Sequence, residues 1–267
     1  MIFKYFLYDK FFFMLVDTHS HIYSEDFSND LEEVIQRAFE NDVRKIVLPN
    51  IDSSSVKKML NLADKYPQIC YPQIGLHPTS VNEDYEEELE LIEFWIKKRK
   101  FYGIGEVGID LYWDKTFIAE QTDAFRRQII LAKKYELPVV VHVRESFDEV
   151  YAVLQEEKDG RLKGVFHSFT GTPEQAQLIT DLGFKLGING IITFKNNGLD
   201  QLISKIDPSH ILLETDSPYL TPVPFRGKRN ESSYLVYVAQ KVAEIYHLPV
   251  AEIARITTEN AAELFKI

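Results

Sequence analysis

The chain has 267 residues, of which 45% are hydrophobic and 27% charged, a composition typical of a globular protein with a large apolar core. Its formal net charge of −11 argues against a protein that coats duplex nucleic acid through a basic surface, but it allows a local cationic site. The single cysteine, Cys70, excludes an intramolecular disulfide and fits a reducing compartment, so we expect a cytoplasmic location.

The first segment, residues 1–13, is rich in apolar and aromatic side chains but is interrupted by charged ones. It is too short and too broken for a membrane span, and it lacks the small-residue cleavage site of a signal peptide. The apolar run Phe11–Val16 predicts a buried strand, and Met14 offers an alternative start. We therefore interpret residues 1–267 as a single domain in which residues 1–13 are an extension without a catalytic role.

Eight short apolar runs alternate with amphipathic segments of helical length. In chain order the runs are FFFMLVDTHSH, RKIVLPN, ICYPQIGLHP, FYGIGEVGID, LPVVVHV, GVFHSFTG, FKLGING and HILLETDSP. Most of them are continuously apolar, as expected of parallel strands that are buried on both faces. Eight such alternations predict an α/β protein, a single (β/α)8 TIM barrel. A doubly wound sheet is the alternative, but no Gly-x-Gly-x-x-Gly motif follows the first run.

The helical segments carry recognisable patterns. Val56, Met59, Leu60 and Ala63 have the spacing of one buried helical face. The sequence TPEQ at Thr172–Gln175 combines an N-cap threonine, a proline at the first helical position and a capping-box glutamine. We expect a helix to begin there.

Side chains suited to metal binding cluster at the predicted C-terminal ends of the strands, where barrel enzymes have their active sites. They are His19, His21, His77, Glu106, His142, His167 and Asp216. On an extended segment, His19 and His21 point in the same direction because side chains alternate between faces. Each residue alone could be a hydrogen-bonded strand-end group. Together in one cavity they would be costly to bury without an ion, so the sequence predicts a metal site.

The motifs around these residues resemble a known family. DTHSH, GLHP, GEVGID, HVRE, FHSFTG, GINGIITFKN and ETDSPYLTPVPFRGKRNE occur in this order. The set is similar to that of the TatD-type metal-dependent deoxyribonucleases, within the amidohydrolase-like barrels, from about Asp17 to the C-terminus. The chain departs from the family at Ser168, where a cysteine is common, and at Ser232, where a proline is often found.

The resemblance implies a metal-dependent hydrolase that cleaves phosphodiester bonds of DNA through a water activated by two metal ions. Because the deep mouth of a barrel cannot easily admit a duplex, we expect an exonuclease acting on single strands or ends, without a membrane or an obligate protein partner. His19, His21 and Asp216 would hold one ion. His142 and His167 would hold the other, and Glu106 would bridge the two.

Two of these residues are the expected catalytic groups, Asp216 and Glu106, and Asp216 would orient or deprotonate the water. Glu214, two residues before Asp216, is expected to support the ligands. Four imidazoles with two carboxylates favour zinc, manganese, iron or cobalt over magnesium by ligand type, whereas the family is usually described as magnesium-dependent. Two divalent ions per chain, Zn, Mn or Mg, are therefore expected.

Further polar groups near the same face are candidates for binding the phosphates of the substrate. They are His77, Arg144, Lys195, Asn196 and Arg226. Lys228 and Arg229 could act in the same way or form solvated surface. Tyr112 and Trp113 could stack an unpaired base or pack as a lid on the rim of the barrel.

Two other classes of function are open at this point. One is an amidohydrolase, a lactonase or an aminoacyl-tRNA deacylase, which would cleave a C–N or C–O bond. The other is a metal-dependent binding protein without catalytic activity, against which the complete set of candidate ligands argues.

Overall fold

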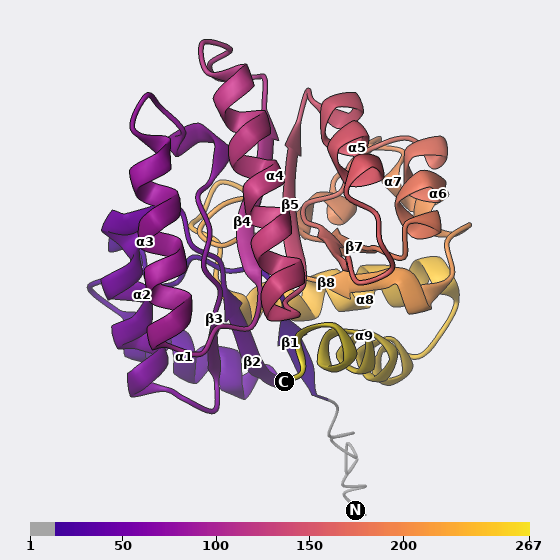
Figure 1. Cartoon of the computed structure of the whole chain (residues 1–267). Coiled ribbons are helices and arrows are strands. Elements are labelled where there is room, and N and C mark those ends of the chain that lie inside the picture. Colours follow the sequence, from indigo (N-terminus) through magenta and orange to yellow (C-terminus); the bar gives the residue numbers. More distant parts are fainter. Residues whose placement is uncertain (1–13) are drawn as a thin grey trace, which may run out of the picture.

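Eight parallel strands form the centre of the molecule and helices surround them, in a computed structural model that describes residues 14–267 (Figure 1). The strands are β1 (Leu15–Asp17), β2 (Val43–Leu48), β3 (Cys70–Pro72), β4 (Ile104–Asp110), β5 (Val139–Arg144), β6 (Gly164–Phe166), β7 (Lys185–Ile188) and β8 (Ile211–Leu213). The helices are α1 (Leu31–Glu40), α2 (Ser53–Lys65), α3 (Tyr85–Lys98), α4 (Ile118–Tyr135), α5 (Phe147–Glu156), α6 (Pro173–Asp181), α7 (Leu199–Ile203), α8 (Leu235–Tyr246) and α9 (Val250–Phe265).

The strands pair in sequence order around a ring. Strands β1 to β3 form one parallel sheet and β4 to β8 form another. Isolated parallel bridges connect the two sheets at both seams, Ile74 with Ile104 and Ser20 with Ser217. This is the (β/α)8 barrel that the alternation of apolar runs and amphipathic segments predicted.

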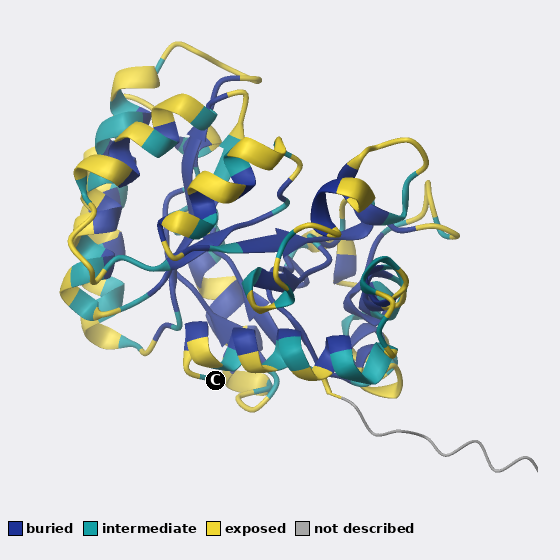
Figure 2. Ribbon diagram, turned by 90° about the vertical axis from the view of Figure 1, so that its right-hand side faces the viewer, coloured by how far each residue is buried: buried dark blue, intermediate teal, exposed yellow. Residues whose placement is uncertain are grey.

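The barrel is filled with side chains and is covered at one end. A core cluster inside it combines side chains of the strands, such as Val16, Val140 and Leu212, with Leu264 and Phe265 of α9. Helix α9 contacts both β1 and β8. In Figure 2 the strands are buried, whereas the surrounding helices expose their outer faces. Buried polar side chains, among them His19 and His167, lie at the opposite end, where the strands finish.

The local helix signals are confirmed. Thr172 accepts a hydrogen bond from the backbone of Gln175, whose side chain accepts one from the backbone of Thr172. The predicted apolar face of α2 is buried throughout. The predicted strand at Phe11–Val16 is observed as Leu15–Asp17, while the interpretation of residues 1–13 as an extension lies outside the described residues.

Two candidate ligands lie further inside the strands than the sequence suggested. Glu106 was expected after its strand but lies within β4, and His142 lies within β5. The reason is that β4 and β5 remain paired as far as Asp110 and Arg144. Gly108 permits their close approach, because a Cβ atom there would lie 2.0 Å from the carbonyl oxygen of His142 and its φ is +149°.

No helix within residues 14–267 is both long and apolar enough to cross a bilayer.

Candidate metal centre

The side chain of Glu106 lies at the centre of the polar cluster, and its two oxygens face different partners. Oε1 is 2.7 Å from His142 Nδ1 and 2.8 Å from His167 Nε2. Oε2 is 3.1 Å from His19 Nε2 and 3.7 Å from His21 Nε2. Asp216 Oδ1 lies 3.7 Å from His19 Nε2 and 3.8 Å from His21 Nε2. All six predicted ligands thus meet at one end of the barrel.

The distances between ligand atoms suit metal coordination. Three groups have ligand atoms within 4.8 Å of one another: His19 with His167 and Asp216, His19 with His21 and Glu106, and His77 with Glu106 and His142. The groups overlap, so distance alone does not divide the residues between ions. The rings of His19 and His167 are stacked with their centroids 4.0 Å apart.

Two of the histidines have a second hydrogen-bond partner that fixes the direction of the ring. His142 Nε2 donates to Asp110 Oδ2 at 2.9 Å. The Tyr23 hydroxyl donates to the carbonyl of Pro49, so it accepts from His21 Nδ1 at 3.2 Å. In each case the other ring nitrogen faces Glu106, which is the arrangement by which carboxylate and hydroxyl partners orient metal-binding histidines.

His167 is oriented from behind by Glu214. Its Nδ1 lies 3.4 Å from Glu214 Oε1, which also accepts from the backbone of Ser168 at 2.7 Å. Gly187 makes room for this carboxylate, because a Cβ atom there would lie 2.3 Å from Glu214 Oε2. Glu214 therefore lies behind the cluster, in contact with His167.

His19 shows that the cluster fits an ion. The side chain is fully buried, and neither of its ring nitrogens has a hydrogen-bond partner in the described part of the chain. A buried imidazole without a partner is costly. Its Nε2 points at the carboxylates of Glu106 and Asp216, so a divalent ion between them would satisfy all three groups.

Burial and neighbouring charges determine the protonation of the cluster. Burial lowers the pKa of His21 to about 3, so its ring is neutral and can bind a metal. Burial raises the pKa of Asp216 to about 6. Burial would also raise the pKa of Glu106, but the surrounding imidazoles outweigh it and hold that pKa well below its usual value. Glu106 is therefore ionised and attracts cations.

His77 lies beside the cluster with a different protonation pattern. Its Nδ1 accepts a hydrogen bond from the backbone N–H of Thr79 at 3.1 Å. In the neutral ring the proton is then on Nε2, which lies 3.3 Å from Glu106 Oε1. An Nε2–H group is a donor, so this ring is prepared to donate a hydrogen bond rather than to bind a metal.

The predicted cationic residues differ in whether they already form an ion pair within the described part of the chain. Arg229 pairs with Asp30 at 2.7 Å, so it is used in the structure. Arg144 and Arg226 pair with no carboxylate of residues 14–267. The guanidinium of Arg144 lies 3.9 Å from the ring centre of Tyr112, and that of Arg226 lies 3.8 Å from the ring centre of Phe194. Lys195 and Asn196 are exposed in the loop after β7.

Sequence reasoning missed two groups that hold this site together. Asp110 binds His142, and its position four residues after Glu106 on the same strand was the available signal. Asp17 accepts from the backbone and the hydroxyl of Thr215, which connects β1 to the segment that carries Asp216. Asp17 and Thr215 are 198 residues apart in the sequence, so no local pattern could reveal their contact.

We expect Asp110→Asn to weaken metal binding by about ten- to a hundredfold, because His142 loses the carboxylate that orients its ring. Competition with a chromogenic chelator measures this. The matched control is Asp114→Asn in the loop that follows β4, because Asp114 is exposed and its carboxylate accepts hydrogen bonds from Thr116 in that same loop. Equal metal affinity in the two variants would contradict a role for Asp110.

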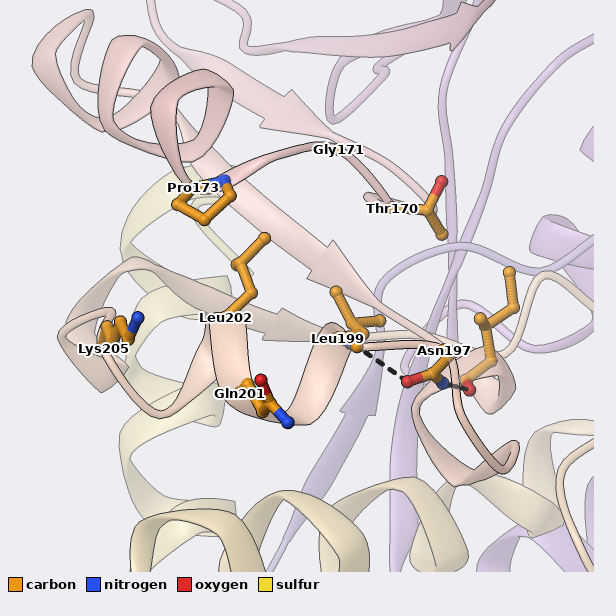
Figure 3. Close-up of a pocket in the computed structure, with 10 residues that line it drawn as sticks. Thr170, Gly171, Pro173, Asn197, Leu199, Gln201, Leu202 and Lys205 are labelled. Carbon is orange, nitrogen blue, oxygen red and sulfur yellow. Dashed lines mark hydrogen bonds between the residues drawn. The ribbon is translucent and has the colours of Figure 1, made fainter.

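Two cavities lie near the ends of β6 and β7. One, of about 270 Å³, lies between α7 and the segment from Thr170 to Pro173, where α6 begins, with Leu199 and Leu202 facing it (Figure 3). None of the candidate ligands lines it. The other, of about 310 Å³, reaches His167 and is the cavity that adjoins the metal cluster.

Comparison with known proteins gives the family. Residues 16–266 match the family described as TatD related DNase. The chain belongs to this TatD family. It is 41% identical over 255 residues to an uncharacterized metal-dependent hydrolase, YabD, of Bacillus subtilis, covering 95% of this chain and 100% of YabD.

Solved structures of TatD-family proteins share the fold. The crystal structure of the TatD homologue YjjV of Escherichia coli is 32% identical, with a TM-score of 0.89 over 95% of this chain and 98% of YjjV. A TatD-family hydrolase of Entamoeba histolytica, 24% identical, matches with a TM-score of 0.81 over 95% and 98% of the two chains, which shows the fold alone. The resemblance seen in the motifs is confirmed, and the TatD chain described here is a metal-dependent hydrolase.

Proposed function

We propose that the chain hydrolyses phosphodiester bonds of DNA with two divalent ions. One would be held by His19, His21 and Asp216, and the other by His142 and His167, with Glu106 between them. The observation that carries this proposal is that the two carboxylate oxygens of Glu106 face different histidines. Oε1 faces His142 and His167, and Oε2 faces His19 and His21. A carboxylate placed in this way suits a bridge between two cations.

The ions would supply a lowered pKa for water and a positive field for the negative charge of the phosphate. Zinc and manganese suit the imidazole-rich set, and magnesium is the third candidate. Asp216 is proposed to accept the proton of the water, since it lies at the mouth beside the histidines. His77 would donate its Nε2–H to a phosphate oxygen, and Arg144, Lys195 and Arg226 would bind neighbouring phosphates.

The burial of the cluster favours single strands or ends as substrates. Only 3% of Glu106 is exposed and His19 is fully buried, so a phosphate must enter the barrel to meet them. A flexible strand end can do this, whereas the middle of a duplex cannot. We therefore propose exonuclease action. The single, buried cysteine Cys70 is compatible with action in the reducing cytoplasm.

Arg226→Ala should raise KM for an oligonucleotide several-fold, with kcat and metal content nearly unchanged. It should also reduce the slope of binding affinity against salt concentration by the equivalent of about one phosphate contact, because a cation near the phosphates of the oligonucleotide is removed. Steady-state kinetics at several salt concentrations measure both effects. Arg161→Ala, which removes an exposed arginine paired with Asp159, is the control. A fall in metal content in Arg226→Ala would contradict this role.

The function is tested by incubating the metal-loaded chain with end-labelled single strands, blunt duplexes, lactones and aminoacyl esters. The proposal expects single strands to be shortened progressively from one end, and a chelator to abolish the reaction. Hydrolysis of a lactone, an amide or an aminoacyl ester without any cleavage of DNA would establish the rival C–N or C–O hydrolase instead.

A further inference from the structure

Two exposed aromatic rings and an arginine form a small platform beside the metal centre. Trp113 is 67% exposed and Tyr112 is 49% exposed, and their ring centres are 4.9 Å apart at 85°. The guanidinium of Arg144 lies 3.9 Å from the ring centre of Tyr112 and 5.1 Å from that of Trp113. A large part of the surface of both rings is therefore accessible to a ligand.

The platform is connected to the candidate metal ligand His142 through Asp110. Asp110 Oδ1 accepts hydrogen bonds from the backbone N–H groups of Tyr112, at 3.0 Å, and Trp113, at 3.1 Å. Its other oxygen accepts from His142 Nε2. Arg144 pairs with Asp110 in the register of β4 and β5, strands that lie side by side in Figure 1. The backbone that carries the two rings is thus held next to the metal centre.

Arg144 differs from most arginines of this chain because it forms no ion pair with a carboxylate of the described residues. Ion pairs to carboxylates of the described residues are formed by Arg37, Arg44, Arg99, Arg126, Arg127, Arg161, Arg229 and Arg255. Among the ten arginines of the sequence, only Arg144 and Arg226 form no such pair within residues 14–267. In an acidic protein a guanidinium without a carboxylate keeps its donors available for an anionic ligand.

We propose that Trp113 and Tyr112, together with Arg144, bind one unpaired nucleobase and its phosphate next to the bond that is cleaved. The inference rests on the proposed function and names its substrate more closely, as a strand whose bases are unstacked. The exposed face of Trp113 offers a stacking surface to any base, while Arg144 donates to the adjoining phosphate. Bases within a duplex are already stacked and paired, so this site selects single strands and frayed ends.

The test compares two strands that differ only in their bases. An oligothymidylate and an abasic strand of equal length carry the same phosphates, but only the first can stack. For hydrolysis by the metal-loaded chain, Trp113→Ala should lower kcat/KM for the oligothymidylate by about tenfold and leave the abasic strand within twofold. Trp113→Phe should retain most of the activity, because it keeps a ring.

Phe94→Ala is the matched control. Phe94 is also an exposed aromatic residue, 50% exposed, with the ammonium of Lys98 5.7 Å from its ring centre, but it lies on α3. Phe94→Ala should leave kcat/KM unchanged for both strands. Loss of activity toward both strands in Trp113→Ala, or toward neither, would overturn the proposal.

A binding measurement separates this inference from the proposed reaction. The chain has two tryptophans, so Trp95→Phe makes Trp113 the sole source of tryptophan fluorescence. In an Asp216→Asn background that does not consume the strand, oligothymidylate should quench this fluorescence and the abasic strand should not. Quenching without any hydrolysis by the wild-type chain would support the stacking site and reject the proposed reaction. Hydrolysis without quenching would overturn the stacking site alone.

Discussion

Asp216→Asn should lower the hydrolysis of a labelled single-stranded oligonucleotide by on the order of a hundredfold or more. The substitution is nearly isosteric and leaves an oxygen to face the histidines, so the chain should fold normally. The amide cannot accept a proton at neutral pH, so the group proposed to take the proton of the water is lost. The ion proposed at His142 and His167 should be retained, because the carboxylates behind these two rings are those of Asp110 and Glu214.

The measurement is turnover at saturating manganese, with metal content determined on the same samples. Asp26→Asn is a suitable control, because Asp26 is exposed and its carboxylate accepts a hydrogen bond from the neighbouring Ser24. Turnover close to wild type in Asp216→Asn would remove this residue from the chemistry and leave it a ligand at most.

Glu106→Gln should have the larger effect on metal binding. The carboxylate is buried among five imidazoles and is ionised, so its charge is the main local attraction for a cation. An amide of the same shape has no charge and directs an NH₂ group at one of the histidine nitrogens. We expect most of the bound metal to be lost and turnover to fall by on the order of a thousandfold, equivalent to several kcal/mol of stabilisation.

Metal content by mass spectrometry and hydrolysis of the same oligonucleotide measure the two effects. Glu149→Gln, an exposed carboxylate on α5, provides the comparison. A Glu106→Gln chain that binds two ions with unchanged affinity would contradict the bridging role.

The fold could be predicted because its signals are local and repeated. Continuous apolar runs alternate with amphipathic segments, and a parallel barrel is the arrangement that buries both faces of such strands. The convergence of His19, His21, His167 and Asp216 then follows from the rule that strand ends meet at one face. These residues are far apart in the sequence, but the topology alone brings them together.

Other features depend on contacts that no local pattern shows. Arg226 and Arg229 are three residues apart and look equivalent in the sequence, yet only Arg229 meets Asp30, 199 residues away. The depth of Glu106 and His142 within their strands depends on how far β4 and β5 remain paired. The exposure of Tyr112 and Trp113 depends on the path of the loop that Asp110 holds.

Equilibrium dialysis of the metal-stripped chain against Mn²⁺, with hydrolysis of an end-labelled single strand measured on the same samples, tests the two-ion nuclease most directly. The proposed centre predicts two ions per chain at saturation, with shortening of the strand appearing only as the second ion binds. Full turnover with one ion bound, or two bound ions without any cleavage of DNA, would contradict it.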